Sequence, residues 1–260
     1  MKFMLKQKTL RPYKVAVKDI KNSQVVFQGP PLCVRQKMLT NASQQHGIDF
    51  ENQIHLALHG TPKEEYERLI EGGYTAVFDI VKGIKDIDFN GSIKVTGGNG
   101  VACGDIVRMY NHTSGDDATP YTLIVGRYTQ VTKTIKEYHI IYEFYIKPEH
   151  HSILWGSMQL NTIEEFVNYV KNIPHGKEAQ LENKKLWKDK RQHIYENEGS
   201  GLMTINAKID SRSQRRTQAS LNIKFLKESD IPFKKYTQEY RGFVLPYIQE
   251  NAPKRKLNKK

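Results

Sequence analysis

An α+β protein, with a mixed and largely antiparallel central sheet flanked by helices, is expected from two features of the 260-residue sequence. Residues 48–58 repeat apolar side chains at helical spacing, whereas residues 76–147 are rich in Ile, Val, Tyr and Phe and are divided by turn residues. A chain of this length can bury a large core, and no linker divides it. A single domain is therefore predicted over residues 1–253, followed by a disordered basic tail at 254–260.

Four helical segments are expected. In the first, Ile48, Glu51, His55 and Leu58 recur at helical spacing and share one face, and Gly60 ends the helix. A carboxylate such as Glu51 is out of place in this apolar stripe unless it meets a partner. Capping patterns and runs of helix-forming residues predict the other helices at 62–70, 162–170 and 177–195.

Strands are expected mainly in the middle of the chain. Residues 76–82, 92–96 and 101–109 are predicted to be three consecutive strands joined by tight turns, and the second turn is Gly97-Gly98-Asn99-Gly100. β-Rich composition predicts further strands at 121–129, 138–147, 204–210 and 219–225.

The two tight turns determine which side chains face each other. The first hairpin sets Asp79 opposite Lys94, and a two-residue turn in the second sets Ser92 opposite Asp105. Because side chains alternate along a strand and opposed residues share a face, all four are predicted to project from one side of a three-stranded meander. Two carboxylates and a lysine on one sheet face are costly unless something uses them.

A bound metal ion would use this arrangement. Carboxylate oxygens are hard ligands that suit Mg²⁺, which keeps several waters and joins a phosphate oxygen. The ion stabilises charge on a scissile phosphate, and a nearby lysine can orient the attacking water or help to deprotonate it. Asp79, Asp105 and Glu51 are therefore candidate metal ligands, and Glu51, Asp79 and Lys94 are candidate catalytic residues.

The order of these elements resembles a known family. A helix with an inward Glu51, a strand with Asp79 in Val77-Phe78-Asp79-Ile80, and a hairpin into Ser92-Ile93-Lys94 are similar to the PD-(D/E)xK nuclease core, which includes type II restriction endonucleases. The resemblance covers about residues 46–110. It implies a restriction-endonuclease-like fold in which Asp79 binds metal, Lys94 acts near the water and Glu51 supports the site.

The sequence departs from the family motif at two positions. Phe78 stands where the motif has proline, and Ser92 stands where it has an acidic metal ligand. Asp105 or Glu51 would have to supply the missing carboxylate. If neither does, the fold would survive without catalysis.

The same residues also have ordinary structural interpretations. Asp79 and Lys94 could form a cross-strand ion pair, which contributes little at a surface. Glu51 could be a helix-edge carboxylate beside His55. Asp86 and Asp88 of the first hairpin are interpreted as turn residues rather than ligands, and His112 is expected to be exposed in a polar loop.

Charge favours a nucleic-acid partner. Lys and Arg outnumber Asp and Glu by 40 to 28, and a net charge of +12 attracts phosphate chains. Within the polar run 211–218, arginine and glutamine side chains can form paired hydrogen bonds with guanine and adenine, respectively. The candidate DNA-binding residues are Arg212, Gln214, Arg215, Arg216 and Gln218. The alternative is a solvated basic turn.

The sequence thus predicts an Mg²⁺-dependent endonuclease acting on double-stranded DNA, in a sequence-specific, restriction-enzyme-like manner. Its catalytic core would span about residues 46–147 and its DNA-contacting part about 175–250. A homodimer would supply two active sites for two strands, although no residue indicates one. The alternatives are a non-catalytic nucleic-acid-binding protein with a degenerate nuclease fold, and an interaction protein whose charge only keeps it in solution.

The cellular setting is expected to be cytoplasmic. The basic first ten residues lack the apolar segment of a secretory signal, and no apolar run is long enough for a membrane span. Cys33 and Cys103 match no disulfide framework or zinc-binding spacing, so two free thiols in a reducing compartment are predicted.

Overall fold

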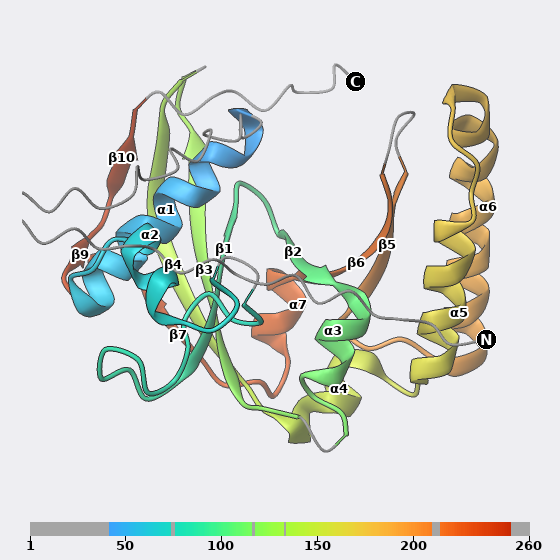
Figure 1. Ribbon diagram of the computed structural model, residues 1–260, viewed down its shortest axis with the longest axis horizontal. Coiled ribbons are helices and arrows are strands. Elements are labelled where there is room, and N and C mark those ends of the chain that lie inside the picture. The colour runs from blue at the N-terminus through green and yellow to red at the C-terminus, as the bar shows by residue number, and fades with distance from the viewer. Residues whose placement is uncertain (1–41, 74–75, 116–117, 133, 210–213, 251–260) are drawn as a thin grey trace, which may run out of the picture. The chain divides into compact units, whose positions relative to one another are not determined.

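The computed structural model of the chain describes residues 42–73, 76–115, 118–132, 134–209 and 214–250, with side chains from Gly47 onward (Figure 1). Three predictions fall on residues outside these ranges. They concern Cys33, Arg212 and the basic tail at 254–260.

A five-stranded mixed sheet is built from the middle and the end of the chain. β1 (Asn90–Thr96) pairs in parallel with β3 (Tyr121–Gln130), which pairs antiparallel with β4 (Lys136–Ile146). The short strands β7 (Phe233–Tyr236) and β10 (Tyr247–Gln249) also pair antiparallel with β4. Three of the four pairings are antiparallel and helices flank the sheet, so the expected α+β fold class is confirmed.

A second sheet is antiparallel, with strand order β2 (Gly100–Asp105), β6 (Arg215–Asn222) and β5 (Thr204–Ile209). The strands β8 (Glu239–Tyr240) and β9 (Phe243–Val244) form a separate two-stranded ribbon. The strand predicted at 204–210 is confirmed. The strand predicted at 219–225 begins earlier, at Arg215, and therefore includes part of the polar run; it ends at Asn222, and residues 223–225 are helical instead.

The predicted meander of three consecutive strands is wrong. Residues 76–82 form no strand, and one isolated antiparallel bridge joins Ile80 to Gly91. β1 and β2 follow one another across the glycine-rich turn but pair with β3 and β6 in separate sheets. Their buried side chains explain the divergence, because Ile93 of β1 and Val101 of β2 belong to different hydrophobic clusters.

Helices occur at all four predicted places. These are α1 (Ala42–His59), α2 (Lys63–Tyr66) with the 3₁₀ turn η1 (Glu67–Leu69), α5 (Leu160–Lys171) and α6 (Lys177–Glu198). Four further short helices were not predicted: α3 (Ile106–Asn111), η3 (Pro148–His150), α4 (His151–Trp155) and α7 (Ile223–Glu228). Within the described ranges, none of the helices combines the length and apolar character needed to cross a membrane.

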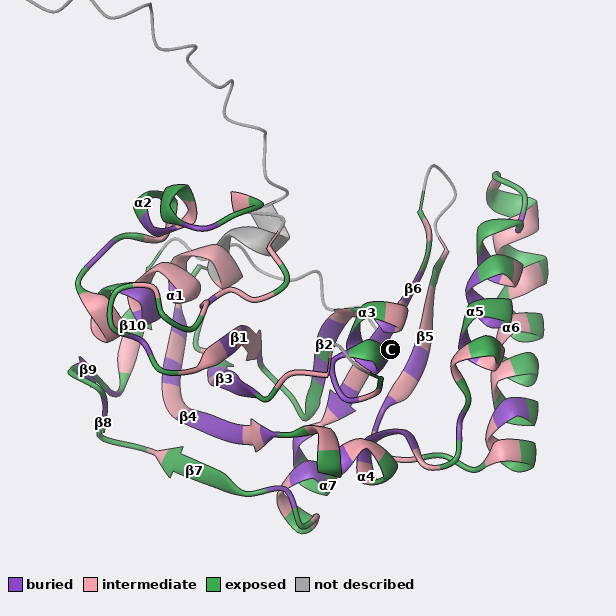
Figure 2. Cartoon of the chain, turned by 60° about the horizontal axis from the view of Figure 1, so that its bottom comes forward, coloured by how far each residue is buried: buried purple, intermediate pink, exposed green. Residues whose placement is uncertain are grey.

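The five-stranded sheet has a hydrophobic cluster on each face. Along β3, Leu123 and Val125 pack in one cluster with α3, α4 and α5, whereas Ile124 packs in the other, beneath α1. β3 and β4 are accordingly buried along most of their length, whereas α6 is largely exposed (Figure 2).

The close packing of α1 against the sheet depends on Gly126 of β3. The ring of Phe50 lies where a Cβ at Gly126 would be, and it stacks on Tyr138 with ring centroids 4.7 Å apart. A side chain at this position would push α1 away from the sheet. Phe50 precedes Glu51, so this contact also determines where the Glu51 carboxylate lies.

Candidate functional site

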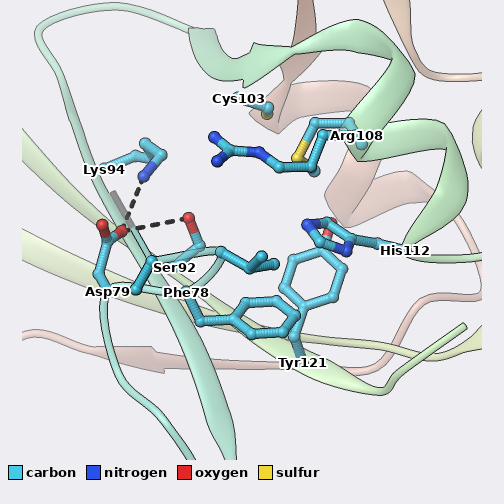
Figure 3. A pocket seen from close by; sticks show the side chains of 11 residues that line it. Phe78, Asp79, Ser92, Lys94, Cys103, Arg108, His112 and Tyr121 are labelled. Atoms are coloured by element: carbon cyan, nitrogen blue, oxygen red, sulfur yellow. Dashed lines mark hydrogen bonds and ion pairs between the residues drawn. The ribbon is translucent and has the colours of Figure 1, made fainter. Parts of the chain in front are cut away.

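Asp79 and Lys94 lie together, as predicted. The Ile80–Gly91 bridge brings the end of the 76–80 segment alongside β1. Asp79 Oδ2 then accepts hydrogen bonds from Lys94 Nζ at 2.9 Å, the Ile93 backbone N–H at 2.7 Å and Ser92 Oγ at 3.3 Å (Figure 3). Because none of the described strands pairs with β1 on this side, the N–H of Ile93 is available to the carboxylate. Lys94 Nζ also donates to Ile93 O at 2.8 Å.

The charges around Asp79 keep it ionised. Burial opposes ionisation, but the Lys94 ammonium and the Ile93 N–H outweigh that cost and hold the pKa of Asp79 below its usual value. All three hydrogen bonds reach Oδ2; among the described residues, none donates to Oδ1. One oxygen of a carboxylate that is ionised at neutral pH is therefore left for a ligand.

Glu51 is paired with a lysine that the sequence analysis missed. Lys63 Nζ lies 2.6 Å from Glu51 Oε2 and 3.7 Å from a carboxylate oxygen of Glu67. The Lys63 backbone N–H donates to Asn52 Oδ1 at 2.9 Å, which fixes the start of α2 against α1. Lys63 stands between Pro62 and the two acids Glu64 and Glu65, and this local pattern gives no sign that the lysine belongs to a site.

Glu51 is not a simple helix-edge carboxylate. Burial, and next the negative charge of Asp79, raise the pKa of Glu51 to about 7, although Lys63 and Lys94 act in the opposite direction. The two acids and two lysines therefore belong to one electrostatic cluster. A carboxyl group whose pKa is raised in this way is typical of a functional site, although structural ion pairs also shift pKa values.

The raised pKa of Glu51 makes a testable prediction about stability. The unfolded chain releases this proton near pH 4.5 and the folded protein near pH 7, so the wild type loses stability as pH rises between these values. Glu51→Gln has no such proton to lose. We expect its unfolding free energy, relative to the wild type, to increase by about 2 kcal/mol from pH 5 to pH 8, since each pKa unit corresponds to about 1.4 kcal/mol.

Urea unfolding at the two pH values, in the presence of a chelator, measures this difference. Glu64→Gln removes an exposed carboxylate from α2 and is the matched control, for which we expect almost no pH-dependent change. If the two variants gave the same pH dependence, the Glu51 carboxyl would have an ordinary pKa.

Asp105 does not join the cluster, and this prediction is wrong. The strand expected at 101–109 ends at Asp105, which caps α3 by accepting a hydrogen bond from the Arg108 backbone N–H at 3.0 Å. Its strand pairs with β6, opposite Gln218, and not with Ser92 of β1. Aspartate is a preferred residue at the N-cap of a helix, but the β-rich composition of this segment concealed that signal.

Two of the three predicted metal ligands, Glu51 and Asp79, interact electrostatically in this cluster. In the parts of the chain that the structure describes, no three His, Cys, Asp or Glu side chains gather to hold a metal ion. Mg²⁺ often uses one or two carboxylates and completes its shell with waters and phosphate oxygens. Glu51 and Asp79 offer two, and the mutual repulsion that raises the pKa of Glu51 is a cost that a divalent cation would relieve.

A cavity of about 130 Å³ opens beside Asp79 and Lys94. Arg108, which was also missed, reaches into it from α3 toward Lys94 (Figure 3). His112 lies on the opposite wall. It is buried and stacks on Phe78, with ring centroids 4.8 Å apart, so the prediction that it is exposed is wrong.

Cys103 also lines the cavity, and burial raises the pKa of its thiol to about 11, which excludes a thiolate nucleophile at neutral pH.

The polar run forms one edge of a β-ribbon. Gln218 lies opposite Asn206 of β5, and Arg216 lies opposite Lys208. These four residues share the face that points away from the core, and Gln214 is exposed just before the strand. On its other side Gln218 pairs with Asp105, so the polar face reaches the start of α3.

Arg215 does not belong to this face. Its Nε donates to Ile173 O at 2.8 Å, and its Nη2 donates to Pro174 O. These contacts connect β6 to the segment after α5. Arg215 and Arg216 face opposite sides of the sheet because side chains alternate along a strand. The Arg215 guanidinium is therefore held by backbone carbonyls after α5 and does not lie with Arg216 and Gln218.

Asp86 and Asp88 are exposed turn residues, as interpreted from the sequence. The left-handed φ of 58° at Asp86 is typical of such a turn.

In comparisons with known proteins, no family model, curated protein or solved structure matches the chain.

Proposed function

We propose that the chain is an Mg²⁺-dependent endonuclease that hydrolyses phosphodiester bonds in DNA. The observation that carries the proposal is the cluster of Asp79, Lys94, Glu51 and Lys63, in which two carboxylates and two ammonium groups interact. Asp79 and Lys94 line a cavity together with Arg108, and Glu51 lines a separate hollow that also includes Lys94. Such a cluster combines the hard oxygen ligands and the cationic groups that phosphoryl chemistry requires.

The residues of the cluster have separate roles in this proposal. Asp79, through Oδ1, and Glu51 would hold Mg²⁺, which supplies charge neutralisation at the phosphate and lowers the pKa of a bound water. Lys94 is held by Asp79 and Ile93 O and can orient the attacking water. Lys63 holds Glu51 in place, and Ser92 donates to Asp79, so it acts as a partner of a ligand instead of as a ligand.

Double-stranded DNA is the proposed substrate. The net charge of +12 favours phosphate binding. The face formed by Asn206, Lys208, Arg216 and Gln218 adds donors and acceptors suited to base edges, and a two-stranded ribbon can enter the major groove. Gln218 of this face lies opposite Asp105, which lines a second cavity together with Arg108.

A non-catalytic nucleic-acid-binding protein is the second candidate. Two observations favour it: a serine occupies the usual acidic position at 92, and each carboxylate of the cluster is engaged by a lysine. In that case the acids and lysines would only neutralise one another.

Incubation of the purified protein with duplex DNA, in Mg²⁺ and in chelator, tests both candidates. We expect cleavage in Mg²⁺ only, and discrete fragments if recognition is sequence-specific. Salt-sensitive binding without cleavage at any Mg²⁺ concentration would support the second candidate. Absence of binding at low salt would contradict both. A parallel assay with RNA determines which nucleic acid is cut.

A further inference from the structure

A second, larger cavity adjoins the one beside Asp79 and Lys94. Its volume is about 590 Å³, and it shares four lining residues with the smaller cavity: Val77, Phe78, Arg108 and His112. Small-molecule sites commonly measure about 300–1,000 Å³. The candidate site therefore continues into a space larger than a metal ion and a phosphate group require.

Arg108 stands where the two cavities meet. The Asp105 side chain accepts a hydrogen bond from the Arg108 backbone N–H at 3.0 Å, which fixes the first turn of α3 and with it the start of the Arg108 side chain. No carboxylate in the described ranges forms an ion pair with Arg108. An unpaired guanidinium that points toward Lys94 is suited to bind a phosphate group through two parallel hydrogen bonds (Figure 3).

The wall of the larger cavity has a different chemistry. Phe78 stacks on His112 with an interplanar angle of 26°, and Val77, beside it, is 51% exposed. Burial, and next the charge of Arg108, lower the pKa of His112 to about 4, so its ring is uncharged at neutral pH. A neutral aromatic pair and an exposed aliphatic side chain offer an apolar surface directly beside a cationic one.

Adjacent cationic and apolar surfaces match the two halves of a nucleotide. We propose that the joined cavities bind one nucleotide of the substrate with its base unstacked, the phosphate between Arg108 and Lys94 and the base against Val77 and Phe78. The inference rests on the proposed function, since it assumes a nucleic-acid substrate. Enzymes that extrude a base hold it against aromatic and apolar side chains in this way, and such contacts are tolerant of base identity.

Binding of two labelled single strands, measured by fluorescence anisotropy in chelator, tests the inference without cleavage. One strand carries bases, and the other has the same phosphates but tetrahydrofuran abasic residues. We expect the wild type to bind the strand with bases about tenfold more tightly. Phe78→Ala should abolish this preference, and Arg108→Ala should weaken binding of both strands by a similar factor, because it removes a phosphate contact.

Two further variants keep the test independent of folding. Val77→Asp changes an exposed side chain, so it should remove the preference for bases with little change in thermal unfolding. Lys171→Ala removes one positive charge from the exposed end of α5 and should leave the affinity for both strands within about twofold.

The two proposals fail separately. Equal binding of both strands by the wild type, or an unchanged preference in both Phe78→Ala and Val77→Asp, would overturn the nucleotide site even if Mg²⁺-dependent cleavage is observed. A base preference that these variants abolish, without cleavage of any DNA, would keep the nucleotide site and reject the nuclease. Failure of the wild type to bind either strand would overturn the nucleotide site as well.

Discussion

Replacement of Lys94 by alanine is expected to lower the rate of Mg²⁺-dependent cleavage by about 100- to 10,000-fold, the range typical of a lost group that assists proton transfer. Lys94 Nζ is held 2.9 Å from Asp79 Oδ2 and 2.8 Å from Ile93 O, so it is positioned by two acceptors at the cavity wall. Binding should weaken by only a few-fold, since one positive charge among many is removed.

Single-turnover cleavage with saturating protein measures the first quantity, and anisotropy with labelled duplex DNA in chelator measures the second. Lys82→Ala is the matched control, because Lys82 is exposed in the loop between Asp79 and Lys94 and its loss should leave cleavage unchanged. Persistent Mg²⁺-dependent cutting by Lys94→Ala, at a rate near that of Lys82→Ala, would refute the role given to this lysine.

Local sequence patterns predicted the parts of the site that depend on local structure. The helical spacing of Ile48, Glu51 and His55 describes α1, and the turn between residues 79 and 94 brings Asp79 to Lys94. Both depend on residues within about one helix or one hairpin. The contact survives even though the expected first strand is reduced to the Ile80–Gly91 bridge.

Long-range pairing explains most of what could not be predicted. β1 pairs in parallel with β3, and β2 pairs with β6, which lies near the other end of the sequence. Alternation along a strand predicts which side chains share a face but not which strand lies next to it. The error at Asp105 follows directly, because its predicted neighbour Ser92 is in the other sheet.

Lys63 and Arg108 were missed for a related reason. Each is an isolated basic residue at the start of a short helix, and its role arises only when tertiary packing brings that helix to the cluster. Tertiary packing also surrounds Ser92. Its hydroxyl donates to Asp79, and Glu51 of α1 interacts electrostatically with the same aspartate.

Asp79→Asn is expected to have a still larger effect, lowering cleavage by about 1,000-fold or more. Loss of a metal ligand removes several kcal/mol of transition-state stabilisation, and each 1.4 kcal/mol corresponds to a factor of ten. The variant should bind DNA in chelator at least as tightly as the wild type, because a negative charge beside the cavity is removed. Cleavage and binding are thus predicted to change in opposite directions.

A second readout separates an electrostatic role of Asp79 from a merely structural one. The charge of Asp79 contributes to the raised pKa of Glu51, so Asp79→Asn should lower that pKa from about 7 toward its usual value. Carboxyl-detected NMR titration of ¹³C-labelled glutamate measures this shift, with Asp88→Asn as a control in the exposed part of the same hairpin. A Glu51 pKa that does not move would show that the two carboxylates do not interact, and a shared metal site would then lose its physical basis.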